Sequence, residues 1–158
     1  MNNVDVERLL QECRDELGSI KALLTGIGDA ALPTPYIKKY AVIRATGSIE
    51  SSFKQIIADR VDQDSHAQLK NFIARKIRNS SYNPRLEMMQ GMLTEFDEEW
   101  RARFDEKIAL ADQPVLKGAL TELVKARNSF AHGGATELPI DRTIECFEHA
   151  CIVLLLLD

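Results

Sequence analysis

Aromatic residues, prolines and cysteines are all scarce in this 158-residue sequence, which contains 6% aromatics, five prolines and three cysteines. The scarcity of aromatics and prolines, in a chain whose apolar residues are mostly Leu, Ile and Ala, disfavours strands and favours helices. Cys13, Cys146 and Cys151 are odd in number and show neither Cys-x-x-Cys nor Cys/His ligand spacing. They predict no disulfide framework and no zinc site, and we interpret them as reduced, buried thiols of a cytosolic protein.

The sequence also lacks a targeting segment and a run long enough to span a membrane. Residues 1–5 contain no positive region followed by an apolar run, so no signal peptide is predicted. The apolar stretch 151–157 is far too short to cross a bilayer and predicts a helix buried on all sides, in the core or at a subunit contact. A formal charge of −4 argues against indiscriminate polyanion binding, so any nucleic-acid contact should be focal. We expect a cytoplasmic protein that contacts no membrane.

Chain length and hydrophobic periodicity predict one domain covering residues 1–158. A chain of this length buries about 68–70% of its unfolded surface, which is enough for a single core. There is no internal repeat, low-complexity tract or linker. Helical spacing of apolar residues, with turn residues between the segments, predicts helices over about 4–25, 35–61, 65–78, 84–94, 96–104, 114–128 and 139–158. The expected fold is an all-α bundle with up-down core helices and additional short helices.

Residues 123–134 form the stretch that most strongly suggests chemistry, because Arg127, Asn128 and His132 lead directly into a Gly-Gly pair. The apolar stripe of the 114–128 helix, projected forward, places Arg127 on the inward face. An inward guanidinium needs a carboxylate, a carbonyl, a water-filled cleft or a phosphate ligand. The alternative is an Arg that bonds the last carbonyls of its helix. Sequence position alone leaves both interpretations open.

The spacing between Arg127 and His132 is not specific, since Arg60–His66 and Arg142–His149 have similar spacings. The second pair lies inside a strongly apolar helix, and the first crosses an acidic turn whose carboxylates would repel phosphate. Only the Arg127 motif combines an inward-facing Arg, the adjacent amide of Asn128 and a glycine-flanked His just before the last helix.

Other polar residues are candidates for supporting roles. Glu50, near Arg44 and Ser48 on the long second helix, is either a solvated boundary carboxylate or a partner that orients an active-site Arg or His. We include Arg44 and Ser48 with it as possible supporting residues.

Two runs of charged residues could be functional sites or ordinary solvated surface. The basic residues of the third helix are either a solvated face or part of a groove for the phosphate backbone of a nucleic acid: Lys70, Arg75, Lys76 and Arg78. The acidic residues around 97–106 point in several directions and have no accompanying His, so no metal site is predicted. Their spacing predicts ion pairs between residues 97 and 101 and between 99 and 103.

At Arg127-Asn128-Ser129-Phe130-Ala131-His132 the sequence resembles the HEPN superfamily. The signature of that superfamily is an Arg, often followed by Asn or another polar residue, then four to six residues and a His ahead of the terminal helix. The resemblance extends over the whole chain as a helical bundle, and its details look most like the branch associated with RiboL-PSP domains. It implies a metal-independent endoribonuclease, since many members serve in toxin-antitoxin, CRISPR-associated and phage-defence systems, commonly with an active site built from two subunits.

The chemistry implied by the resemblance requires neither metal nor cofactor. RNA carries its own nucleophile in the 2′-hydroxyl, so cleavage needs proton transfer and stabilisation of charge on the phosphorane-like transition state. His132 would be general base or acid, Arg127 would hold phosphate oxygens, and Asn128 would position His132 or the phosphate. The expected products carry a 2′,3′-cyclic phosphate and a 5′-hydroxyl.

One geometric requirement predicts a second subunit. In a continuous helix, five residues separate Arg127 from His132 by about 140°, which is unsuitable for a shared target. Either a break near Ser129 or the pairing of two motifs across a two-fold axis would resolve this. We therefore expect a homodimer with a composite active site, an RNA substrate and an antitoxin or other regulatory partner. The alternative is a non-catalytic module that binds RNA or protein with a separately encoded partner.

Overall fold

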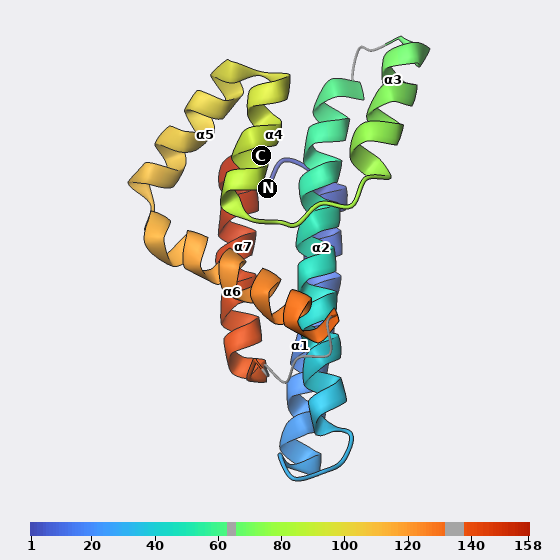
Figure 1. The fold of residues 1–158 in the computed structure, drawn as a ribbon, viewed down its shortest axis with the longest axis vertical. Helices are drawn as coiled ribbons and strands as arrows, with labels where there is room; N and C mark the ends of the chain where they lie inside the picture. Colours follow the sequence, from blue (N-terminus) through green and yellow to red (C-terminus); the bar gives the residue numbers. More distant parts are fainter. Residues whose placement is uncertain (63–65, 132–137) are drawn as a thin grey trace.

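The structure is a computed structural model that describes residues 1–62, 66–131 and 138–158 (Figure 1). In these residues the chain forms seven α-helices and one π-helical segment and contains no strand, which confirms the predicted all-α class. The elements are α1 (Val4–Ile27), α2 (Thr34–Asp62), α3 (Ala67–Ile73), η1 (Ala74–Arg78), α4 (Leu86–Phe96), α5 (Glu98–Leu110), α6 (Gln113–Ala131) and α7 (Ile140–Leu157). None of the described helices is both long and apolar enough to cross a membrane.

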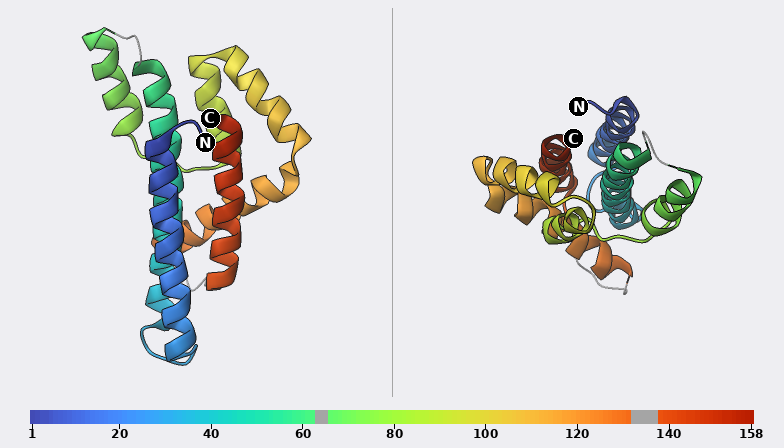
Figure 2. Two further views of the ribbon diagram at one scale, coloured as in Figure 1. Left: turned by 180° about the vertical axis from the view of Figure 1, so that it is seen from behind. Right: turned by 90° about the horizontal axis from the view of Figure 1, so that it is seen from above.

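Three long helices form the frame of the molecule. α1 and α2 run antiparallel along its long axis, and α7 runs upward beside them (Figures 1 and 2). α6 crosses α7 and α2 obliquely, α3 flanks α2, and α4 and α5 lie on the opposite side. The core between these helices is centred on large, fully buried side chains such as Phe53, Phe104 and Phe147. The predicted up-down core helices with short additions therefore describe the arrangement.

Helix α1 shows how the sequence sets the helix ends. Asn3 accepts a hydrogen bond from the backbone N–H of Val6 at 3.1 Å, which satisfies one of the free donors of the first turn. At the other end Gly28 adopts a φ of 81°, a backbone conformation that glycine reaches without steric penalty. The buried residues of α1 recur at intervals of three or four, as its amphipathic pattern predicts: Val6, Leu10, Cys13, Leu17, Ile20 and Leu24.

The last helix differs from the expectation that it is buried on all sides. Val153, Leu154 and Leu157 are buried, but Ile152 is 42% exposed and Leu155 is 51% exposed. The apolar run is continuous and therefore covers all sides of α7, whereas the core covers only one side. The remaining apolar residues lie on the surface beside α1. Its other predicted setting, a subunit contact, stays a prediction.

The charged region around α5 also differs in detail. Arg101 pairs with Asp105 at 2.6 Å instead of with Asp97. Asp97 precedes α5 and accepts a hydrogen bond from the backbone N–H of Trp100, so its carboxylate caps the helix. The other predicted pair, Glu99 with Arg103, forms at 3.5 Å between exposed side chains.

Candidate functional site

Arg127 lies on α6, one turn before the last described residue of that helix. Leu116, Leu120, Leu123 and Val124 are buried, as their spacing predicts, and Arg127 follows them on the same side. α6 continues without interruption to Ala131, three residues beyond the predicted end, so of the two ways to bring Arg127 and His132 together the break near Ser129 does not occur. Residues 127–131 contain neither Gly nor Pro, and therefore nothing in their sequence ends the helix early. The other predicted catalytic residue, His132, lies outside the described residues, as does the Gly-Gly pair that follows.

The guanidinium of Arg127 is directed toward two side chains from distant parts of the chain. Its Nη1 donates a hydrogen bond to Oδ1 of Asn83 at 2.9 Å. The same nitrogen lies 3.9 Å from Oε2 of Glu50, and the Arg127 side chain is 31% exposed. The inward-facing interpretation of Arg127 therefore describes its position better than helix capping does, and part of the side chain still reaches solvent.

Glu50, on α2, connects the groups around Arg127. Its Oε1 accepts a hydrogen bond from the backbone N–H of Tyr82 at 2.8 Å and lies 2.7 Å from Nζ of Lys54. Lys54 also donates to the carbonyl oxygen of Ser80. Only 14% of the Glu50 side chain is exposed, so it is not a solvated surface carboxylate. Glu50 and Lys54 together fasten the segment 79–85 to α2, and this places Asn83 against Arg127.

Arg44 and Ser48 lie on a different side of α2 and are not brought to Arg127. Arg44 Nε pairs with Oε2 of Glu16 on α1 at 2.5 Å, and its Nη1 donates to Oγ of Ser48. The hydrogen bond that Arg44 donates to the Glu16 carboxylate raises the pKa of Arg44. Two residues of a helix separate Ser48 from Glu50 by about 200°, which accounts for their opposite directions. Arg44 and Ser48 were expected to support the Arg127 site. In the structure they stabilise the contact between α1 and α2.

Asn128, the third predicted catalytic residue, is half-buried beside Arg127 on α6. Two residues further on, the Phe130 ring lies under the ammonium group of Lys39, with 5.0 Å between Nζ and the ring centroid. This contact places the start of α2 beside the end of α6. The site thus combines the end of α6, the middle of α2 and the segment 79–85.

Three members of the site were not predicted from the sequence, and only one of them has a signal in it. The segment 80–84 is recognisable as a chain break with Pro84, but nothing there marks Asn83 as the partner of an Arg that lies 44 positions later. Tyr82 contributes a backbone N–H, which any residue other than proline carries. Lys54 follows Glu50 at the i,i+4 spacing of helix ion pairs, and this is the one regularity that points to it.

The predicted RNA-binding residues occupy α3 and η1, next to the segment 79–85 in Figure 1. Lys70, Arg75, Lys76 and Arg78 are all exposed. Arg78 donates to Oδ1 of Asp59 at 3.1 Å. Lys76 lines a cavity of about 450 Å³ that also contacts Tyr82.

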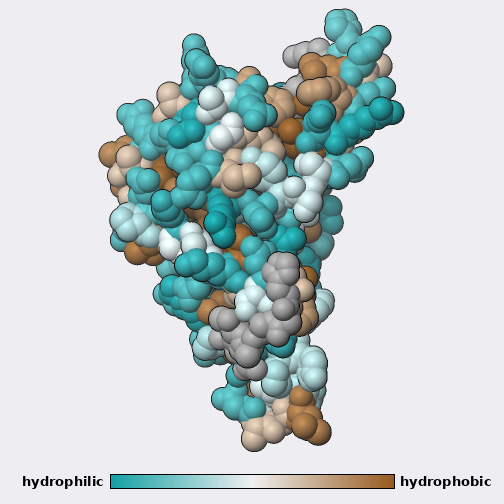
Figure 3. Space-filling model, in the orientation of Figure 1, coloured by the Kyte–Doolittle hydropathy of each residue, from teal (hydrophilic) through white to brown (hydrophobic). Residues whose placement is uncertain are grey.

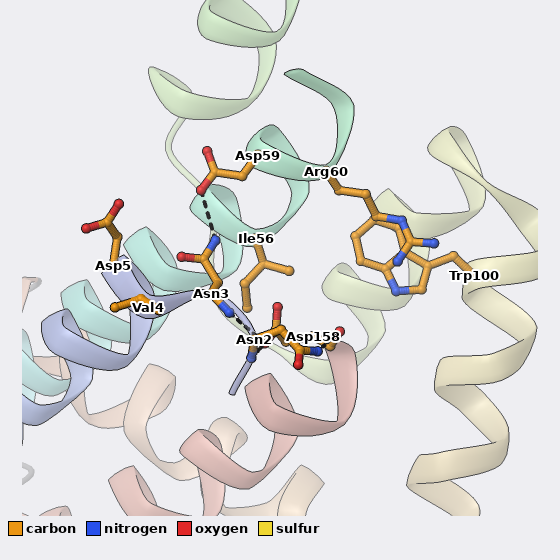
Figure 4. Close-up of a pocket in the computed structure, with 9 residues that line it drawn as sticks. All are labelled: Asn2, Asn3, Val4, Asp5, Ile56, Asp59, Arg60, Trp100 and Asp158. Carbon is orange, nitrogen blue, oxygen red and sulfur yellow. Dashed lines mark hydrogen bonds between the residues drawn. The ribbon is translucent and has the colours of Figure 1, made fainter. Parts of the chain in front are cut away.

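Among the described residues, no side-chain cluster suited to a metal ion accompanies Arg127, and a second cavity lies elsewhere in the molecule. The described part of the chain contains no group of three or more His, Cys, Asp or Glu side chains placed to hold a metal ion. A cavity of about 700 Å³ lies near the chain termini, between Asn3, Asp59, Arg60 and Trp100 (Figure 4). Asn3 there donates to Asp59 and Asp158, while Arg60 lies 4.3 Å from the centroid of the Trp100 ring. These contacts link the ends of the chain to α2 and α5, away from Arg127.

The fold and the site together define an all-α bundle in which Arg127, near the end of α6, donates a hydrogen bond to Asn83 and lies 3.9 Å from a carboxylate of α2. The chain belongs to the RiboL-PSP-HEPN family, whose family model matches residues 8–158. This confirms the resemblance seen in the sequence, including the branch. Neither a curated protein nor a solved structure matches the chain. Membership of a HEPN family indicates a nuclease or an RNA-binding module.

Proposed function

We propose that the protein is a metal-independent endoribonuclease that acts in the cytoplasm as a toxin or phage-defence effector. The observation that supports this best is the arrangement at Arg127, whose guanidinium is held by Asn83 and stands 3.9 Å from Glu50, with 31% of its side chain exposed. A guanidinium positioned in this way is ready to receive a phosphate without reorganisation, which is how positioned charges lower a reaction barrier.

The cleavage uses the RNA itself as nucleophile. One His132 accepts the proton of the 2′-hydroxyl, whose oxygen attacks the adjacent phosphorus. Arg127 stabilises the charge that develops on the phosphoryl oxygens, and Asn128 positions the phosphate or His132. The bond to the 5′-oxygen breaks, and that oxygen takes a proton from a protonated His132. The products carry a 2′,3′-cyclic phosphate and a 5′-hydroxyl.

The continuity of α6 supports a composite site. The helix runs unbroken through Arg127 to Ala131. If helical geometry also held at position 132, the side chains at 127 and 132 would point about 140° apart around the helix axis. Two motifs facing each other across a two-fold axis allow the Arg127 of one subunit and the His132 of its partner to reach one phosphate. We propose a homodimer for this reason, restrained in the cell by an antitoxin or other regulatory protein.

A second function is favoured by one observation. Asn83 and Glu50 already occupy part of the guanidinium of Arg127, as they would if that residue only fastened α6 to the segment 79–85. The protein would then be a non-catalytic module that binds RNA or protein together with a separately encoded partner.

Cleavage assays in EDTA distinguish these functions. Wild-type protein should cut single-stranded or structured RNA, and both Arg127→Ala and His132→Ala should abolish cutting. A substrate with a 2′-deoxy residue at the cut site should resist cleavage. Arg103→Ala is a matched control, because Arg103 is half-exposed on α5 in an exposed pair with Glu99. Cleavage that persists in both motif variants, or that requires added metal, contradicts the proposed mechanism.

A further inference from the structure

A cavity of about 450 Å³ opens between η1 and α4, at the edge of the segment 79–85. Three aromatic residues line it: Phe72, Tyr82 and Phe96. Lys76 and Glu95 add one positive and one negative group. The volume lies in the range of small-molecule sites, and a concave surface of aromatic rings with a few polar groups is the usual form of such a site.

The aromatic rings are partly fixed and partly exposed. The Tyr82 ring stacks on Phe53, with 5.9 Å between the centroids and 24° between the planes, and its hydroxyl donates to the Met88 carbonyl at 2.6 Å. Burial, and after it the Glu95 charge, raise the pKa of Tyr82, so the phenol is neutral at ordinary pH. Phe72 is 53% exposed, so its ring is accessible to a ligand in the cavity. Figure 3 shows hydrophobic surface at α3 among hydrophilic residues.

The cavity is connected to the Arg127 site through consecutive residues. Tyr82 lines the cavity with its side chain and donates its backbone N–H to Glu50. The next residue, Asn83, accepts the hydrogen bond from Arg127. The cavity and the Arg127 site therefore share the segment 79–85, with Tyr82 at the cavity and the adjacent Asn83 at Arg127.

The charges around the cavity favour a nucleic-acid strand as its occupant. Arg75 and Lys76 are exposed on η1, and Lys70 precedes them on α3. Cationic side chains of this kind bind the phosphate backbone, while aromatic rings next to them stack on unpaired bases. An apolar side chain of a protein partner would contact the aromatic rings, but it would make no favourable contact with the basic residues.

We propose that this cavity binds one unpaired nucleobase of the RNA, next to the phosphate held by Arg127, and that it prefers guanine. The base stacks on the exposed Phe72 ring. The Glu95 carboxylate accepts hydrogen bonds from the N1–H and N2–H of guanine, and Lys76 donates to O6. Uracil offers only one N–H on this edge, between two carbonyl oxygens, and it leaves Glu95 and Lys76 poorly matched. The position next to the cleaved phosphate rests on the proposed function, whereas binding of the base does not.

Fluorescence anisotropy on His132→Ala protein tests the proposal without RNA cleavage. The probes are a labelled twelve-residue oligouridine and the same strand with one central guanosine. The strand with guanosine should bind more tightly, and Phe72→Ala should weaken its binding by roughly 5- to 150-fold, the usual effect of removing one stacking platform. Glu95→Gln should reduce the preference for guanosine over uridine by at least about fivefold.

Two control variants separate base recognition from other effects. Arg75→Ala should weaken the binding of both strands by a similar factor, because a phosphate contact carries no base preference. Leu110→Ala removes an apolar residue that is 85% exposed on α5, outside the cavity, and should change neither affinity. Equal affinity for the two strands, or unchanged binding by Phe72→Ala, overturns the proposal. If binding follows the prediction but wild-type protein does not cut RNA, the base site stands and the nuclease function falls.

Discussion

At the scale of single residues, Glu50 links Arg127 to the segment 79–85 and to Lys54. It accepts from Tyr82 and pairs with Lys54, and both side chains of that pair are at most 14% exposed. Glu50→Ala should lower the free energy of unfolding by about 1.5–3 kcal/mol, because hydrogen bonds to a largely buried charge are lost and Lys54 is left without its partner. Urea unfolding followed by circular dichroism measures the change.

Glu12→Ala is the matched control for Glu50→Ala. Glu12 also pairs with a residue of its own helix, Arg8, but 53% of its side chain is exposed. The control should cost about 0.5 kcal/mol or less, since exposed helix pairs contribute little. Equal losses in the two variants would show that Glu50 does not fasten the segment 79–85.

Two thiols, the buried Cys146 and the partly buried Cys151, predict how stability changes with pH. Burial raises the pKa of Cys146 and of Cys151 to about 12, from 9.0 for a free thiol. The unfolded chain therefore releases these protons at lower pH than the folded chain does. The stability that this difference contributes is fully present below pH 9 and is lost as the pH rises from about 9 to 12.

The free energy of unfolding measured at pH 8, 9 and 10 should fall with increasing pH, and the slope should be smaller in Cys146→Ala/Cys151→Ala protein. Tyr40 and Tyr82, whose pKa values are also raised, remain as contributors in that variant. A slope unchanged by the double substitution would show that these thiols ionise equally in both states.

At the scale of helices, the sequence predicted most elements but little of how they meet. Amphipathic spacing placed the long helices within a few residues of their observed ends, since one buried face fixes their period. It also placed Arg127 on the inward stripe while leaving helix capping open, and the break near Ser129, one of its two alternatives, does not occur in α6. The sequence suggests Glu50 as a possible partner for an active-site Arg. It does not suggest Asn83, because the hydrogen bond between Arg127 and Asn83 depends on the path of a connecting segment that has no periodicity.

The unbroken α6 predicts that the register of the motif is essential. Insertion of one alanine between Ser129 and Phe130 turns the following residues by about 100° around the helix axis relative to Arg127. Nuclease activity should fall at least about 100-fold, since even small misplacements of catalytic groups are costly. An alanine inserted between Ala30 and Ala31, in the connection between α1 and α2, is the control and should leave activity unchanged. Retained activity in the α6 insertion would contradict a fixed geometry between Arg127 and His132.

At the scale of the whole molecule, two apolar surfaces are candidates for the contact of the proposed homodimer. The first is on α2, where Tyr36 is 71% exposed and Ile43 is 41% exposed, on the helix that carries Lys39 against Phe130. The second is the exposed part of α7 with Ile152 and Leu155, next to α1. Figure 2 shows α1 and α7 from behind, whereas the segment that carries Asn83 crosses α2 on the front face in Figure 1.

Only the first surface is compatible with a composite active site, because it adjoins the end of α6. Ile43→Arg should therefore convert the dimer to a monomer and abolish nuclease activity, with the monomer retaining its helical circular dichroism spectrum. Leu155→Arg places the same charge on the α7 surface and should change neither property. Sedimentation velocity and the cleavage assay measure both variants. A fully active Ile43→Arg monomer would contradict the composite site. A monomer produced by Leu155→Arg alone would place the two-fold axis at α7, on the far side of the molecule from Arg127, so that the two motifs could not share one phosphate.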